Sequence, residues 1–176
     1  FTMVPLPQAA QISALNGMVA DDFDGDGNLD VLIDGNDYST EVSIGRYDAL
    51  NGLLLKGNGK GAFSPLSILQ SGIYIPGNGK ALVKLKTANE KYLVAASQFR
   101  DSLRVFELRR KTRAILINAD DMYAVIKFTN GVIEKKEFYY GTSFLSQSAR
   151  FITIDENVAS VQVTDKLGKT RMISFN

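Results

Sequence analysis

The sequence contains neither cysteine nor histidine among its 176 residues. Their absence excludes disulfide frameworks, Cys/His zinc sites, thiol nucleophiles and Ser-His-Asp triads. It does not identify a compartment, because many exported bacterial proteins also lack disulfide bonds. The chemistry open to this chain therefore rests on carboxylates, amides, hydroxyls and basic side chains.

Long apolar runs and a strong net charge are absent as well. No run approaches the roughly 18 residues that a membrane-spanning helix needs, so we expect no membrane span. The first residues lack the basic and apolar regions of a signal peptide. The formal net charge is +1, so no overall field recruits nucleic acid. The basic run RRKTR at 109–113 is interpreted as a solvated linker or a charged strand edge.

Short segments rich in β-branched and aromatic residues are abundant, and they predict an all-β chain. They often alternate apolar and polar residues, and Gly, Asn, Asp or Pro bound them. No segment sustains the 3.6-residue apolar period of a helix. The expected strands cover 30–35, 52–57, 81–86, 91–97, 103–109, 114–118, 123–128, 151–154 and 160–164.

Asn-Gly pairs are the most frequent turn signal in the chain. Asn-Gly suits the positive-φ positions of tight hairpins, so the pairs predict turns in an antiparallel meander. Long Gly-rich loops become rarer after residues 109–113. This change predicts two domains, 1–110 and 111–176. The pairs stand at 16–17, 51–52, 58–59, 78–79 and 130–131.

The stretch DDFDGDGNLD at 21–30 gathers carboxylates that would repel one another in a folded chain unless a cation were present. Its spacing, D-x-D-x-D-G-x-x-D, is that of a calcium loop. Many hard oxygen donors favour Ca²⁺, because Mg²⁺ prefers to keep its waters. Asp22, Asp24, Asp26 and Asp30 would supply side-chain oxygens, and Asn28 its backbone carbonyl.

An EF-hand is the obvious comparison for this loop, and the sequence departs from it in two ways. The twelfth position of an EF-hand loop is a bidentate Glu, whereas this chain has Ile33 there. An EF-hand also continues into a helix, whereas DVLIDG predicts a strand. The loop is therefore expected to connect two strands of one sheet.

The stretch MVADDFDGDGNLDVLIDGN at 18–36 resembles an FG-GAP/VCBS repeat, a β-propeller blade with a calcium loop between its first two strands. The segment GLLLKGNGKGAF at 52–63 resembles the strand and turn that close such a blade. Residues 141–171 resemble an ASPIC/UnbV domain, with matches at Leu145–Ser148 and Gly168–Thr170. The combination is similar to the C-terminal part of bacterial relatives of cartilage acidic protein.

The resemblance implies a partial β-propeller, the last blades, at 1–110 with one calcium site, followed by a small antiparallel β-sandwich-like domain at 111–176. It implies a non-enzymatic, calcium-stabilised binding or adhesion module of an exported or cell-surface bacterial protein. The expected partner is an envelope protein or a glycan, with weak self-association through open blade edges. The alternative is an accessory part of a polysaccharide-active enzyme whose catalytic cleft lies in missing blades.

A second candidate site lies in the long insertion at 36–50. A ligand could bind there to the side chains of Arg46, Tyr47 and Asp48. Equally, a buried Arg-carboxylate pair could staple the loop. The sequence leaves both readings open.

Overall fold

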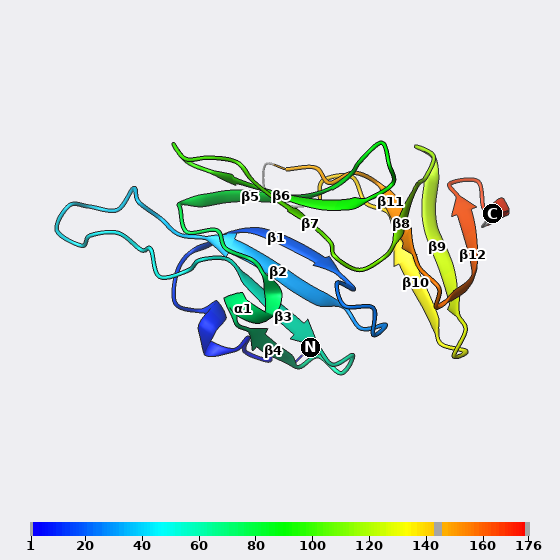
Figure 1. Cartoon of the computed structure of the whole chain (residues 1–176), viewed down its shortest axis with the longest axis horizontal. Coiled ribbons are helices and arrows are strands. Elements are labelled where there is room, and N and C mark those ends of the chain that lie inside the picture. The colour runs from blue at the N-terminus through cyan, green and yellow to red at the C-terminus, as the bar shows by residue number, and fades with distance from the viewer. Residues whose placement is uncertain (1, 143–145, 175–176) are drawn as a thin grey trace. The chain divides into compact units, whose positions relative to one another are not determined.

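The computed structural model describes residues 2–142 and 146–174. These residues are all-β and form antiparallel sheets, as predicted (Figure 1). The chain divides into two compact units. The first comprises Phe1–Leu85, Leu93–Arg110 and Gly141–Ser148, and the second comprises Lys86–Tyr92, Lys111–Tyr140 and Ala149–Asn176.

A four-stranded meander in the order β1-β2-β3-β4 carries the acidic loop. Each strand pairs antiparallel with the next one in the sequence. Buried Ala10, Ile33 and Leu55 form its hydrophobic cluster, and Ala10 comes from the short 3-10 helix η1 (Gln8–Ala10). The strands are β1 (Leu15–Asp21), β2 (Asp30–Gly35), β3 (Leu53–Gly57) and β4 (Phe63–Leu66).

A short helix and a three-stranded sheet follow the meander. The helix α1 (Ile68–Ser71) was not predicted, and it begins with a capping box between Ser67 and Gln70. It ends at Gly72, whose φ of 72° suits a left-handed cap. None of the helices in the described part of the chain has the length and apolar character to cross a membrane. The sheet contains β5 (Gly79–Lys86), β6 (Tyr92–Gln98) and β7 (Arg104–Glu107) in that order.

The second unit is sandwich-like, because side chains from two sheets share one core. Ala124 and Val161 of the larger sheet belong to the same buried cluster as Ile152 and Ile154 of the smaller one. The larger sheet has the order β10-β9-β12-β13, and the smaller one pairs β8 with β11. The bounds are β8 (Arg113–Leu116), β9 (Asp121–Phe128), β10 (Ile133–Glu137), β11 (Phe151–Ile154), β12 (Val158–Asp165) and β13 (Thr170–Ile173).

The sequence did not predict β4, β10 and β13 from their apolar pattern. Each of these strands lies at the edge of its sheet. Edge strands tolerate charge and proline, because one side of their backbone has no partner strand. Accordingly β4 contains Pro65, and β10 reads IEKKE. The missing apolar signal follows from their position in the sheet.

The turn prediction is confirmed at two Asn-Gly pairs, in the hairpins β3–β4 and β9–β10, and wrong at two; the fifth pair, at 51–52, has the positive φ but ends a long connection directly before β3. Gly52, Gly59 and Gly131 have φ values of 73°, 69° and 86°. In contrast, Gly17 lies inside β1 beside an irregularity in its pairing, and Gly79 begins β5. At these two positions the glycine serves close packing, as described below.

In the first unit, the segment 141–148 includes part of the LSQS element of the ASPIC/UnbV resemblance. Leu145 lies outside the described residues. Ser148 is buried, and its hydroxyl accepts a hydrogen bond from the backbone N–H of Lys84 at 3.0 Å. This element is therefore bound to β5.

Ile152 tests the core of the second unit. Its side chain is fully buried, so Ile152→Ala should lower the free energy of unfolding by about 2–5 kcal/mol. Ile133→Ala, at a position that is 65% exposed on β10, is the matched control and should change it by less than about 0.5 kcal/mol. Chemical denaturation measures both, and equal losses would contradict this description of the core.

Candidate metal centre

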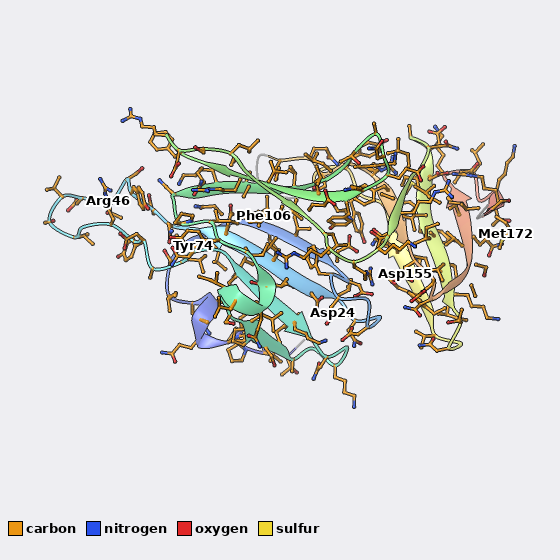
Figure 2. The ribbon with its side chains drawn as sticks, viewed as in Figure 1. Asp24, Arg46, Tyr74, Phe106, Asp155 and Met172 are labelled. Atoms are coloured by element: carbon orange, nitrogen blue, oxygen red, sulfur yellow. The ribbon has the colours of Figure 1, made fainter. Side chains whose placement is uncertain are left out.

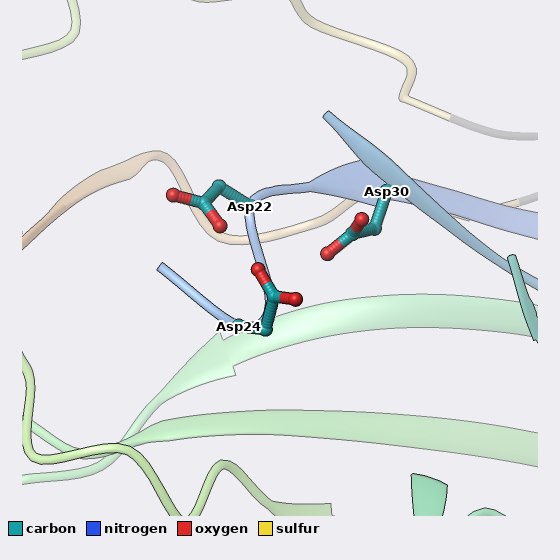
Figure 3. Close-up of side chains that lie close together, drawn as sticks. All are labelled: Asp22, Asp24 and Asp30. Carbon is teal, nitrogen blue, oxygen red and sulfur yellow. The ribbon is translucent and has the colours of Figure 1, made fainter. Parts of the chain in front are cut away.

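The acidic loop at 22–29 closes the hairpin between β1 and β2. The strands pair as far as Asp21 and Asp30, so both ends of the loop meet. One carboxylate oxygen each from Asp22, Asp24 and Asp30 lie within 4.8 Å of one another. Figure 3 shows these oxygens turned toward a shared space. Two oxygens bound to one Ca²⁺ lie at most about 5 Å apart, so this donor set fits the ion.

Backbone amides of the loop hold Asp22 in place. Its Oδ1 accepts a hydrogen bond from Gly25 N at 2.6 Å, and its Oδ2 accepts one from Gly27 N at 3.1 Å. Both glycines have a φ of 86°, which glycine adopts without strain. The D-x-D-x-D spacing adds two further short turns: Asp24 accepts from Asp26 N at 3.2 Å, and Asp26 accepts from Asn28 N at 2.9 Å.

Asp30 ties the loop to the sheet. It is buried, and its Oδ1 accepts a hydrogen bond from Gly57 N of β3 at 2.9 Å. Its Oδ2 accepts one from Phe23 N at 3.0 Å. Burial raises the pKa of Asp22 and of Asp30, although these backbone hydrogen bonds oppose the rise. A cation between the carboxylates would favour their charged forms.

Two basic side chains also reach the loop. Lys56 of β3 pairs with Asp24 and lies 3.0 Å from Asp26 Oδ2. Hydrogen bonds to these two carboxylates raise the pKa of Lys56. Arg110 donates to the backbone oxygen of Asp22 at 3.3 Å and lies 3.7 Å from its carboxylate. A metal ion would share the loop with these cations.

Neither of these contacts was predicted from the sequence. The interpretation of the run 109–113 as solvated is wrong for Arg110, whose side chain is only 21% exposed. Arg110 lies 88 positions from Asp22 in the sequence. No local pattern links residues so far apart, so no signal in the sequence could have paired them.

One of the expected side-chain ligands, Asp26, lies outside the three-carboxylate cluster. The carboxylate of Asp26 faces Lys56. The side-chain oxygen of Asn28 packs against Gly59, where an added Cβ would lie only 2.2 Å away, and this contact does not involve the backbone carbonyl that is expected to bind the ion. The roles of Asp26 and Asn28 as calcium ligands stay predictions.

Arg46, Tyr47 and Asp48 lie on the connection between β2 and β3, at the other end of β2 from the acidic loop (Figure 2). All three are exposed, so the alternative of a buried Arg-carboxylate staple is wrong. Instead the guanidinium of Arg46 lies 4.9 Å from the centre of the Tyr38 ring, and Tyr47 forms a β-bridge with Asp37. Ligand binding by this loop stays a prediction.

No protein-family model matches the chain, and no curated protein matches it.

A variant of Asp30, studied in chelator, distinguishes the structural role of this side chain from its role in binding metal. With chelator present, Asp30→Ala leaves the amides of Gly57 and Phe23 without their acceptor, at about 1–3 kcal/mol each when buried. Asp24→Ala is the matched control, because its side chain is 41% exposed and its loss should stay below about 0.5 kcal/mol. Chemical denaturation in chelator compares them, and equal losses would show that Asp30 does not anchor the loop.

Proposed function

We propose that this chain is a non-enzymatic, calcium-stabilised binding module of an exported or cell-surface bacterial protein. One observation carries the proposal. Asp22, Asp24 and Asp30 converge in the first connection of a four-stranded antiparallel meander. The resemblance to FG-GAP/VCBS blades implies a calcium loop at this connection, between the first two strands.

Asp22, Asp24 and Asp30 would hold the Ca²⁺, which would supply positive charge among carboxylates that repel one another. The ion would act on the sheet as well as on the loop, because Asp30 is bonded to β3 through Gly57. Binding to the folded state alone contributes about 2.7 kcal/mol when the ion is at 100 times its dissociation constant. That is a large share of a typical stability of roughly 5–15 kcal/mol.

The connection at 36–50 supports a binding role, because it places apolar side chains in solvent. Val42 is fully exposed, and Ile44 and Tyr47 are 62% and 50% exposed. Long loops on a rigid scaffold often carry binding residues. We assign this loop to the contact with an envelope protein or a glycan. Weak self-association through blade edges stays a prediction.

Calcium should raise the melting temperature of this protein by several degrees relative to chelator, and more than Mg²⁺ does. Asp24→Ala should abolish this difference, because it removes one of the three converging carboxylates. Asp48→Ala, on the exposed loop, is the matched control and should retain it. Differential scanning calorimetry measures the effect. Identical melting curves in chelator and in millimolar Ca²⁺ would show that the loop is an acidic turn that does not bind calcium.

The binding role can be tested separately on the apolar loop. The double variant Val42→Ser/Ile44→Ser should bind envelope glycans or proteins about tenfold more weakly while keeping its calcium response. Val105→Ser, at a position that is 52% exposed on β7, is the control and should bind normally. Surface plasmon resonance on purified envelope fractions measures binding. Turnover of a polysaccharide by the wild type would instead favour the enzyme alternative.

A further inference from the structure

Among the described residues of the first unit, Asp34 and Asn78 are buried with neither of their side-chain polar atoms hydrogen bonded. Asp34 of β2 is completely buried, and among the described residues neither of its carboxylate oxygens is hydrogen bonded. Asn78 is 1% exposed, and neither polar atom of its side chain has a hydrogen-bond partner among the described residues. Buried polar groups are nearly always paired, so these two side chains need a physical explanation.

Two glycines make the space for the Asp34 carboxylate. A Cβ added at Gly17 in β1 would lie 2.3 Å from Oδ1 of Asp34 and 2.7 Å from the backbone N of Leu82 in β5. A Cβ added at Gly79 would lie 2.7 Å from Oδ2. The carboxylate is therefore enclosed by backbone on both sides. This packing explains why these Asn-Gly pairs are not turns.

The polar groups around Asp34 and Asn78 are already used. Asn16 Nδ2 donates to Gly79 O at 2.7 Å, and Asn36 Nδ2 donates to Gly77 O at 2.9 Å. Gln98 accepts from Gly77 N at 2.7 Å. These bonds hold the segment 77–79 beside β1 and β2. These neighbouring polar groups are therefore hydrogen bonded to one another, and none of these bonds involves the side chain of Asp34 or of Asn78.

The electrostatic surroundings do not support a permanent charge on Asp34. Burial raises its pKa to about 6, against the opposing effects of the Gly17 amide and the Lys80 ammonium. The Gly17 amide lies close enough to lower the pKa, but its geometry is not that of a hydrogen bond. The residues that face it are Gly17 from β1 and Gly79 and Lys80 from β5.

We propose that Asp34 is a proton-binding site that makes the stability of the first unit depend on pH. A proton removes a charge that burial without hydrogen bonds disfavours. A proton also needs no cavity, whereas a metal ion needs oxygen donors on several sides. The closeness of both glycine backbones favours the proton.

The direction of the effect follows from linkage. The unfolded chain binds this proton with a pKa near 3.8, and the folded chain binds it more tightly. The contribution of Asp34 to stability is therefore fully present below that pH and is lost as the pH rises through about 6. Between these two pH limits, the equilibrium constant for folding falls by on the order of a hundredfold.

Asp34→Asn tests the proposal, because the amide imitates the protonated acid in shape and charge. The variant should melt several degrees above the wild type at pH 8, and the difference should shrink as the pH falls through about 6 and disappear below about pH 3.8. Both proteins carry the same acidic loop, so the titration of that loop cancels in the difference. Asp48→Asn, on the exposed loop, is the control and should show no such difference.

Carbon-13 NMR of the wild type tests the same site if the variant does not fold. The side-chain carboxyl resonance of Asp34 should titrate with a midpoint between pH 5.5 and 6.5, on the expectation of about 6. A midpoint below about 4.5, at the value of an ordinary aspartate, would overturn the proposal. Equal melting temperatures of wild type and Asp34→Asn at pH 8 would overturn it as well.

Discussion

The burial of polar groups along β2 is the constraint on which the rest of the first unit depends. Five of its six residues are buried, and two of them, Asp30 and Asp34, are carboxylates. Asn36, directly after the strand, is completely buried as well. A buried charge or amide without compensation would cost several kcal/mol. The neighbouring strands and loops are therefore arranged around these side chains.

The three polar residues are accommodated in different ways. Asp30 accepts hydrogen bonds from β3 and from its own loop, and Asn36 bonds to the backbone of Leu50 and Gly77. Asp34 has neither arrangement, and in our proposal it takes up a proton. The acidic loop gathers several carboxylates, and Lys56 and Arg110 lie beside some of them. The site proposed for Ca²⁺ thus brings three carboxylates together, whereas the site proposed for a proton is the single enclosed carboxylate of Asp34.

The two proposed functional regions lie at opposite ends of β2. The acidic loop precedes Asp30, and the exposed connection with Val42 and Ile44 follows Gly35. A strand that is buried and hydrogen bonded on both sides is a rigid support for both. In our proposal, Ca²⁺ stabilises one end of this support while the loop at the other end contacts a partner. Calcium would then act on the binding loop through the stability of the sheet.

The sequence alone determined the all-β class, most strands and the acidic cluster, because each depends on neighbouring residues. Alternation reports which strand face is buried, and D-x-D-x-D folds through hydrogen bonds between residues two apart. Only the tertiary structure revealed Arg110 at the acidic loop, the edge strands β4, β10 and β13, and the packing of Gly17 and Gly79 against Asp34. An Asn-Gly pair reads the same at a turn and beside a buried carboxylate. What decides between them is contact with chain segments dozens of residues away, which no local pattern encodes.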